Sequence, residues 1–285
     1  MPTYNFIICA VFKNEAHILE EWIKHYLNRG CDHIYLVNDD STDNFLDICL
    51  KYASTVSVFD NDIFTSSNRR VAIYNKYFKP LLTESKWMGI FDLSDFLYNP
   101  DTLVLPEIIE KCEDYSQIVI DCLVFGSNGL DKTPTSIVDC FVKRGLTAGN
   151  NEDNKDNKDN KDNKDNKDNK RSIIKCAELI DFKKNDHEVS GDTLYIKYEE
   201  EAEATDLIIN NYSIQSLQWF LKVKAIRGSL DYTDPVIKIS YFKERDHNDK
   251  FDIRLREQNK VVRRAVKSMR AFSPVADLIT DWAAE

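Results

Sequence analysis

The sequence lacks a basic surplus, a long apolar run and a targeting segment. Its 285 residues include 38 Lys and Arg against 48 Asp and Glu, which gives a formal charge of −10. General nucleic-acid binders usually carry the opposite balance. No stretch approaches the ~18 apolar residues of a membrane-spanning helix, and the first residues show no positive region before a cleavable apolar segment. We therefore expect a soluble, cytoplasmic protein with no nucleic-acid partner.

Cysteine pairs and glycine-rich phosphate loops are also missing. The seven cysteines are odd in number, no two have Cys-x-x-Cys spacing, and most lie in apolar runs. Buried free thiols are the expected state, rather than disulfides or a zinc site. Neither Gly-x-Gly-x-x-Gly nor a Walker A loop follows the first predicted strand. Rossmann dehydrogenases and P-loop enzymes are thereby excluded.

One segment of low complexity interrupts the chain. From residue 153 to residue 170 the tripeptide Asp-Asn-Lys occurs six times, with no apolar residue and with balanced charge. A segment of this composition has nothing to bury, so we expect a disordered loop over residues 149–171. It is either a surface insertion that the fold tolerates or a flexible tether that contacts a partner.

Strands and helices alternate along the first part of the chain. Continuous apolar runs predict strands at residues 6–12, 33–37, 55–59 and 87–91. Apolar residues at helical spacing predict helices at residues 18–27, 43–52 and 69–82. This alternation implies right-handed crossovers and a mainly parallel sheet.

The second part of the sequence is more mixed. Strands are predicted at residues 117–124, 136–142, 172–176 and 194–198, and helices at residues 214–226 and 254–272. The expected fold class is α/β, with a mainly parallel sheet flanked by helices, mixed strands in the second half and a C-terminal helix. We assign residues 1–250 to one domain, interrupted by the repeat loop, and residues 251–285 to a basic C-terminal helical extension.

Polar side chains follow three of the predicted strands. The three clusters are residues 13–15 (Lys-Asn-Glu), 38–43 (Asn-Asp-Asp-Ser-Thr-Asp) and 92–95 (Asp-Leu-Ser-Asp). In an open parallel sheet, ligands bind beyond the carboxyl ends of the strands. Carboxylates at that edge are suited to hydrogen-bonding a base or a ribose, or to holding a hard divalent cation against a diphosphate.

Simpler interpretations of these carboxylates stay open. Asp39 and Asp43 belong to the residue type that caps a helix N-terminus. Asp92 and Asp95 are also suited to a turn, but they come directly after a buried strand, which favours a function. Asp121 interrupts an apolar strand, where it either points into a cleft as an acceptor base or faces water at a sheet edge.

Short motifs follow one another in a fixed order through the chain. They are residues 8–15 (ICAVFKNE), 21–26 (EWIKHY), 35–43 (YLVNDDSTD), 87–97 (WMGIFDLSDFL), 125–129 (FGSNG) and 211–216 (NYSIQS), the last followed by Lys222, Lys224, Arg227 and Gly228. Together they resemble GT-A glycosyltransferases, most closely the family-2-like and family-92-like group. Each motif alone is weak, whereas their order and spacing together are specific and cover most of the chain outside the repeat.

This resemblance implies a GT-A-like domain that transfers a sugar from a nucleotide-sugar donor to a glycan or lipid-linked acceptor. The implied donor is a UDP-sugar, and the implied outcome is inversion at the anomeric carbon. A divalent cation, Mn²⁺ or Mg²⁺, would neutralise the leaving diphosphate. The residues that the resemblance assigns to donor binding are Asn14, Glu15, Asp39 and Arg70, with Asp39 facing the uracil or the ribose.

The metal and catalytic roles also follow from the resemblance. Asp92 matches the first Asp of the metal motif, and Ser94 and His187 are assigned to the same ion. Asp95 is assigned to catalysis by reaching the ion or the sugar. Asp121 is the candidate base for the acceptor hydroxyl on a separate ground, its position as a carboxylate within an apolar strand. His187 has a second interpretation as a surface histidine in a polar loop.

Three positions depart from the pattern of the group. Ser94 stands where a second metal-binding Asp is expected, Asp95 where Glu is usual, and Asn211 where His is expected. Hydroxyl and amide groups are weaker metal ligands than carboxylate and imidazole. A catalytically impaired protein that binds nucleotide sugars is therefore an alternative function. A structural or interaction protein that works through the repeat is a third.

The C-terminal segment has a basic character of its own. Residues 254–270 contain seven basic residues and one acid, Glu257, while Leu255, Val262, Val266 and Met269 share an approximate helix face. Such a helix either lies on an anionic membrane as a peripheral contact or packs on the domain with its basic face in water.

Overall fold

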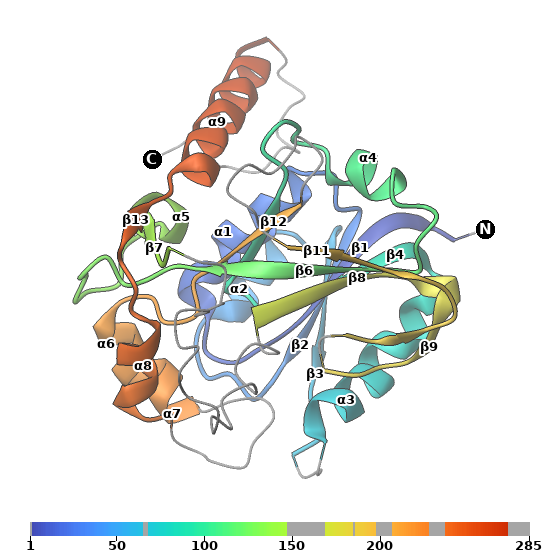
Figure 1. Ribbon diagram of the computed structural model, residues 1–285, viewed down its shortest axis with the longest axis horizontal. Helices are drawn as coiled ribbons and strands as arrows, with labels where there is room; N and C mark the ends of the chain where they lie inside the picture. Colours follow the sequence, from blue (N-terminus) through green and yellow to red (C-terminus); the bar gives the residue numbers. More distant parts are fainter. Residues whose placement is uncertain are drawn as a thin grey trace, which may run out of the picture.

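The computed structural model describes residues 2–64, 68–146, 169–184, 186–197, 207–227 and 237–272, with side chains described as far as residue 264. Within these ranges the chain forms a nine-stranded mixed sheet with helices packed on both faces (Figure 1). The predicted α/β class is confirmed.

The first four strands of the sheet are parallel and lie in the order β3-β2-β1-β4. Their bounds are β1 (Tyr4–Phe12), β2 (His33–Asn38), β3 (Val56–Asp60) and β4 (Ser85–Ile90). The crossovers contain α1 (Ala16–Leu27), α2 (Phe45–Leu50) and α3 (Arg69–Ile73), the last continued by a π-helical turn (Tyr74–Phe78) and a 3₁₀ turn (Lys79–Thr83). Each element predicted between residues 6 and 91 is confirmed, with ends that shift by at most two residues.

The second half of the sheet is mixed. Strand β8 (Lys170–Lys175) runs antiparallel between β4 and β6 (Gln117–Val124). Strand β12 (Ile208–Asn211) is parallel to the end of β6 and antiparallel to β5 (Asp95–Tyr98), while β11 (Thr193–Ile196) is parallel to the start of β6. The strands predicted at residues 117–124, 172–176 and 194–198 are confirmed as β6, β8 and β11, although Tyr198 lies outside the described residues.

Short elements complete the described chain. They are α4 (Leu105–Glu110), α5 (Ile137–Cys140), β7 (Lys143–Arg144), a 3₁₀ turn (Cys176–Glu178), β9 (Leu179–Asp181), β10 (Glu188–Val189), α6 (Leu217–Trp219), a π-helical turn (Phe220–Lys224), α7 (Ala225–Arg227), α8 (Ile239–Arg245), β13 (Lys250–Phe251) and α9 (Arg254–Phe272).

Alternation along β1 fills two hydrophobic cores. Phe6 and Ile8 pack on the side of α1, whereas Ile7 and Cys9 pack on the side of α3. Because both faces of the strand are covered, its sequence is a continuous apolar run rather than an alternating one. All seven cysteines are free thiols and most are buried, as predicted.

Residues 136–142 form α5 and an extended end instead of the predicted strand. The Ser136 hydroxyl accepts a hydrogen bond from the Asp139 backbone N–H at 3.1 Å and caps the turn. The Glu21 carboxylate of α1 accepts the Ile137 N–H at 2.7 Å and the Ser136 hydroxyl at 2.7 Å. A partner distant in the sequence thus satisfies the backbone of this apolar run, which hydropathy alone does not reveal.

Two further boundaries differ from the prediction. The helix predicted at residues 214–226 begins at Leu217, because Gln215 has a φ of 48° and breaks the helical path before it. The predicted repeat loop, residues 149–171, lies mostly outside the described residues. Its last two residues belong to β8, which begins at Lys170.

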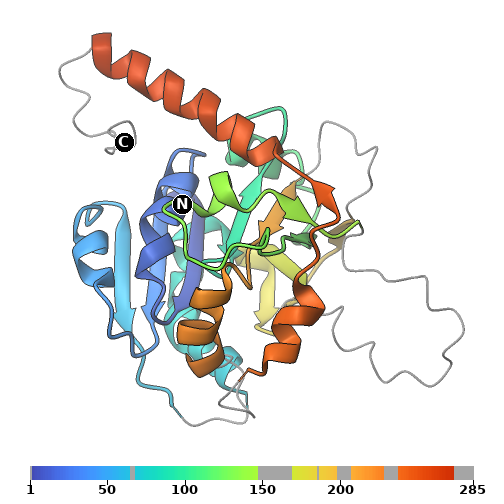
Figure 2. The same ribbon diagram turned by 90° about the vertical axis from the view of Figure 1, so that its left-hand side faces the viewer.

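The C-terminal helix α9 covers the predicted residues 254–272 and runs across the top of the domain (Figure 2). Arg29 donates hydrogen bonds from Nη2 to Gln258 at 2.9 Å and to Asn259 at 2.8 Å, and the side chains of Leu255 and Val262 are buried. The described start of α9 is therefore packed on the domain. None of the helices in the described ranges has the length and hydropathy needed to cross a membrane.

Candidate functional site

The loops that follow β1 and β2 are tied together at the carboxyl edge of the sheet. The Asn14 backbone, with a φ of 53°, donates its N–H to Ser41 Oγ at 3.0 Å, and Asn14 Oδ1 accepts the Thr42 N–H at 2.7 Å. Asp43 accepts the N–H of Ala16, the first residue of α1, at 2.8 Å. Asp43 therefore caps a helix, as one interpretation predicted, but the helix is α1 rather than α2.

Asp39 lies buried at the end of β2 and is held on both of its oxygens. Arg69 at the start of α3 donates two guanidinium N–H groups to the carboxylate, one of them at 3.0 Å to Oδ2. Asn61 donates from Nδ2 to Oδ1 at 2.8 Å. This paired arrangement fixes the loop between β3 and α3 against the end of β2, since bidentate Arg–carboxylate contacts are geometrically specific.

The turn after β4 contains a second buried carboxylate, Asp95, whose side chain has no exposed surface. Its Oδ2 accepts the Asp92 backbone N–H at 2.8 Å and a hydrogen bond from Arg171 Nε, while its Oδ1 accepts from Asn211 Nδ2 at 2.6 Å. The same amide lies 3.4 Å from Ser94 Oγ. Burial raises the pKa of Asp95, an effect that the Arg171 guanidinium opposes.

Arg171 bridges the two carboxylates of this turn. Besides its contact with Asp95, it donates from Nη2 to Asp92 Oδ2 at 2.6 Å and from Nη1 to the Lys170 carbonyl at 2.8 Å. The guanidinium comes from β8, whose pairing with β4 and β6 sets its position. A delocalised cation therefore lies between Asp92 and Asp95, where its planar fork matches carboxylate geometry.

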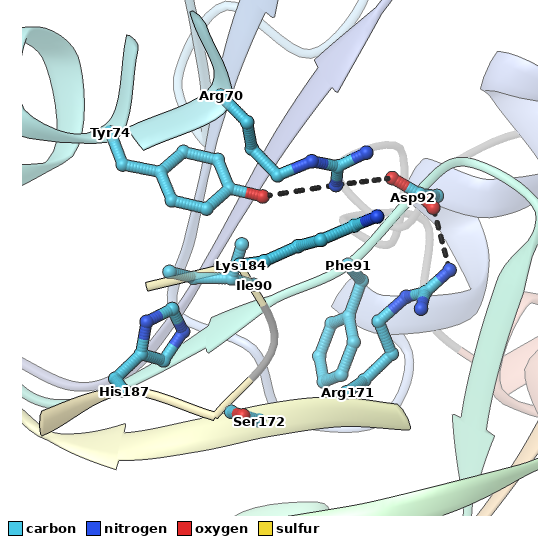
Figure 3. Close-up of a pocket in the computed structure, with 9 residues that line it drawn as sticks. All are labelled: Arg70, Tyr74, Ile90, Phe91, Asp92, Arg171, Ser172, Lys184 and His187. Atoms are coloured by element: carbon cyan, nitrogen blue, oxygen red, sulfur yellow. Dashed lines mark hydrogen bonds and ion pairs between the residues drawn. The ribbon is translucent and has the colours of Figure 1, made fainter. Parts of the chain in front are cut away.

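A small pocket opens beside this bridge (Figure 3). Its walls are formed by Arg70, Tyr74, Ile90, Phe91, Asp92, Arg171, Ser172, Lys184 and His187. Figure 3 shows Arg70 and Lys184 reaching toward Asp92 from one side and Arg171 reaching it from another, with Arg70 Nη1 3.8 Å from Asp92 Oδ1. Three cationic side chains thus surround one partly exposed carboxylate, an arrangement that attracts anionic ligands such as phosphate esters.

Comparison with known proteins now bears on this pocket. A profile described as "Glycosyl transferase family 2" matches residues 7–173, which is more than half of the chain and includes the strand ends and Arg171. The chain belongs to glycosyl transferase family 2. The resemblance on which the sequence prediction rested is thereby confirmed at the level of the family.

Relatives of known identity are distant from this family 2 chain. A glycosyltransferase family 92 protein of Oryza sativa subsp. japonica is 20% identical over 149 residues, which are 51% of this chain and 24% of the relative. Residues 1–349 of S. aureus TarS, a structure also solved with UDP, align at 17% identity and a TM-score of 0.33, over 50% of this chain and 42% of that one. The mannosyltransferase PcManGT of Pyrobaculum calidifontis, solved with GDP-Man and Mn²⁺, aligns at 16% identity and a TM-score of 0.31, over 43% and 37% of the two chains. The chain thus spans less than half of each of these proteins.

Among the residues predicted for the metal ion, Asp92 and His187 line the same pocket and Ser94 lies buried beside Asp95. His187 Nδ1 accepts the Lys183 N–H at 3.0 Å, and its ring packs against those of Phe182 and Tyr74. Burial lowers the pKa of His187 to about 4. In the described ranges no group of three or more His, Cys, Asp or Glu side chains converges on a metal-sized space. The described residues therefore form no metal cage of side chains, and the guanidinium groups of Arg70 and Arg171 lie against the two oxygens of Asp92.

The two residues predicted to act in catalysis lie in different surroundings. Asp95 accepts hydrogen bonds from Arg171 and Asn211 in a buried position. Asp121 on β6 lies opposite Lys170 of β8, with 3.7 Å between Oδ1 and Nζ. Strand alternation places Asp121 on the face of the sheet that it shares with Ser172, a wall of the pocket.

The residues predicted for the donor are spread along the carboxyl edge. Asn14 ties two loops together, Asp39 is engaged by Arg69, and Arg70 lines the pocket. Glu15 is buried, and its carbonyl accepts N–H groups from the first turn of α1. The edge of the sheet thus brings all four together, with Arg70 alone lining the pocket beside Asp92.

Sequence reasoning missed the arginines that neutralise the buried carboxylates, and it missed Lys184. A signal for Arg69 existed, because Arg69 and Arg70 open a predicted helix at its N-terminus, where the helix dipole disfavours cations. A basic pair at that position indicates a partner elsewhere. Arg171 had a weaker signal, a charge two residues before the apolar pair of a predicted strand.

Proposed function

We propose that this family 2 protein transfers a sugar from a UDP-sugar donor to a hydroxyl of a glycan or lipid-linked acceptor, with inversion at the anomeric carbon. The observation that carries the proposal is the pocket in which Arg70, Arg171 and Lys184 surround Asp92 at the carboxyl end of β4. A nucleotide sugar offers a diphosphate to such cations. The adjoining ends of β1 and β2, with Asn14 and Asp39, then receive the nucleoside.

The proposed reaction is a single displacement. The acceptor oxygen forms a bond to the anomeric carbon while the bond from that carbon to the phosphate oxygen breaks, and its electron pair leaves with the diphosphate. The hydroxyl proton passes to a carboxylate, for which Asp121 stays the predicted base. Cationic side chains stabilise the charge that develops on the leaving diphosphate.

Donor binding tests this function directly. We expect UDP and UDP-sugars to bind the full chain in isothermal titration, and UDP to be released when a suitable acceptor is added. Arg70→Gln should weaken UDP binding about tenfold, because a charge-assisted contact to phosphate is lost. Lys76→Gln is the matched control, since Lys76 lies on the same helical segment but pairs with Asp62 at the surface. Absence of binding by UDP, GDP and their sugars would refute the proposal.

A catalytically impaired binding protein is the second candidate function. Ser94 and Asn211 depart from the family pattern, and Asn211 is committed to Asp95 at 2.6 Å. Titration that shows donor binding, together with an acceptor panel that gives neither transfer nor hydrolysis, would favour this candidate over the transferase.

Contact with an anionic membrane through residues 254–270 stays a prediction. The described apolar side chains Leu255 and Val262 are buried against the domain, whereas Val261 is exposed, so such a contact would use the basic side chains together with Val261. Co-sedimentation with phosphatidylserine vesicles at low salt, lost at high salt, is the expected result. Failure to sediment at low salt would remove this partner.

A further inference from the structure

We propose that Arg171 takes the position of the divalent cation in this site, so that the diphosphate of the donor is bound without a metal ion. The inference rests on the proposed function and names how the same pocket holds its ligand. It departs from the metal that the family resemblance implied.

The carboxylates of Asp92 and Asp95 are already engaged by protein groups. Asp95 is fully buried, and its oxygens accept from Asn211, from the Asp92 backbone and from Arg171. Only Asp92 presents surface, at 41% side-chain exposure, and one of its oxygens is already 2.6 Å from Arg171. At phosphate sites Mg²⁺ is usually held by one or two carboxylates together with substrate phosphates and waters. Here the one carboxylate of the turn with exposed surface, Asp92, already has Arg171 against Oδ2 and Arg70 against Oδ1.

The pocket carries a net positive charge. Arg70, Arg171 and Lys184 line it against Asp92, with Asp95 directly behind Asp92. The positive side chains outnumber the negative ones by one before any ligand binds. A divalent cation would enter against this field, whereas a diphosphate is attracted by it.

The guanidinium of Arg171 is fixed in position before any ligand binds. Arg171 belongs to a strand paired on both sides, and its Nη1 donates to the Lys170 carbonyl at 2.8 Å. A cation fixed in this way needs no reorganisation when negative charge develops on the leaving group. Arginine is also the side chain whose geometry suits phosphate oxygens.

Titration of the full chain with UDP, first in EDTA and then in excess Mn²⁺, tests the inference. We expect dissociation constants that agree within about a factor of two. Binding that appears only with Mn²⁺ would overturn the role of Arg171 while leaving the proposed function intact. Absence of UDP and GDP binding in both buffers would instead refute the proposed function.

Variants of β8 make the test sharper. Arg171→Gln should lower UDP affinity in EDTA at least about tenfold, and Mn²⁺ should restore part of it because Asp92 and Asp95 lose their shared counterion. Lys175→Gln is the matched control, since it removes one charge from the same strand where Lys175 faces Glu113 and Glu178. Its UDP affinity should equal that of the wild type.

The folding of the variants is checked separately, because Arg171 supports a buried carboxylate. If Arg171→Gln does not fold, Arg171→Lys keeps the charge but loses the fork, and it should still bind UDP in EDTA with reduced affinity. Unchanged UDP affinity of a folded Arg171→Gln protein in EDTA would overturn the proposal.

Discussion

Arg69 and Arg171 have the same role at the carboxyl edge of the sheet, since each neutralises a buried carboxylate. Each places a guanidinium against a carboxylate that is buried at the end of a strand, Asp39 for the first and Asp95 for the second. A buried carboxylate without such a partner would be costly, since burial disfavours its charged form. The loops of the site are therefore held by ion pairs as well as by apolar packing.

Substitution of Asp39 should reveal the strength of the first pair. Asp39→Asn leaves the Arg69 guanidinium without its buried counterion, and we expect a loss of about 3–5 kcal/mol in the free energy of unfolding. Asp40→Asn is the control, because the neighbouring Asp40 side chain is 68% exposed and forms a surface pair with Lys13 at 3.3 Å. Urea denaturation of both variants measures the difference, and equal stability of the two would contradict the assignment.

His187 makes the stability of the folded protein depend on pH. Its folded pKa is about 4, below the ordinary value of 6.5, so the unfolded chain binds more protons between these two values. Stability should therefore fall as the pH drops through this window, by roughly 3 kcal/mol from this residue. His187→Gln should reduce the slope of unfolding free energy against pH between 4 and 6.5. His25 and His33, whose pKa values are also lowered by burial, contribute slope of the same sign that remains. A slope identical to that of the wild type would contradict this prediction.

The strands and helices show which parts of the fold are local and which are not. Long apolar runs such as β1 and β6 were predictable, because their own composition requires burial on both faces. The short strands β5 and β12 were missed, since each has four residues and exists only by pairing with the other and, for β12, with β6. The pairing of β5 with β12 joins residues more than a hundred positions apart in the sequence.

The candidate site likewise contains residues that local sequence predicts and residues that it does not. The Asp92 and Asp95 carboxylates were predictable from their place after a buried strand. Their cation was not, because Arg171 is 79 residues from Asp92 and no spacing rule connects a turn to a strand at that distance. Asn61 and Arg69 were hidden for the same reason, 22 and 30 residues from Asp39.

The packing of α9 yields a prediction at this scale. Leu255 is 1% exposed, so Leu255→Ala should lower the free energy of unfolding by about 2–4 kcal/mol through lost burial and a cavity. Val261→Ala is the control on the same helix, because Val261 is 57% exposed and should change stability by less than about 0.5 kcal/mol. Urea denaturation followed by circular dichroism distinguishes the two. A small effect of Leu255→Ala would show that α9 is not part of the cooperative fold.

At the scale of the whole molecule, the Asp-Asn-Lys repeat lies inside the region that matches the family. The profile of family 2 ends at residue 173, so it spans the Asp-Asn-Lys repeat as well as the parallel strands. The repeat contains no apolar residue and equal numbers of Asp and Lys. Its composition offers nothing to a hydrophobic core, and its last residue, Lys170, belongs to β8 and pairs with Asp121.

Removal of part of the repeat should leave folding and donor binding intact. Deletion of four of the six Asp-Asn-Lys units is expected to change the free energy of unfolding by less than about 1 kcal/mol, the scale of loop-length entropy. UDP titration and urea denaturation of the shortened chain measure both quantities. Lost UDP binding in a folded, shortened protein would instead show that the repeat acts as a tether or partner contact.

The placement of Arg171 on β8 also affects how the protein folds during translation. Translation delivers Asp92 and Asp95 long before their counterion, with the repeat emerging between them. Until β8 inserts between β4 and β6, the turn after β4 cannot bury Asp95 at low energy. The pocket is therefore completed only when the two halves of the sheet are joined, because a nascent chain that ends before β8 lacks the walls formed by Arg171 and Ser172.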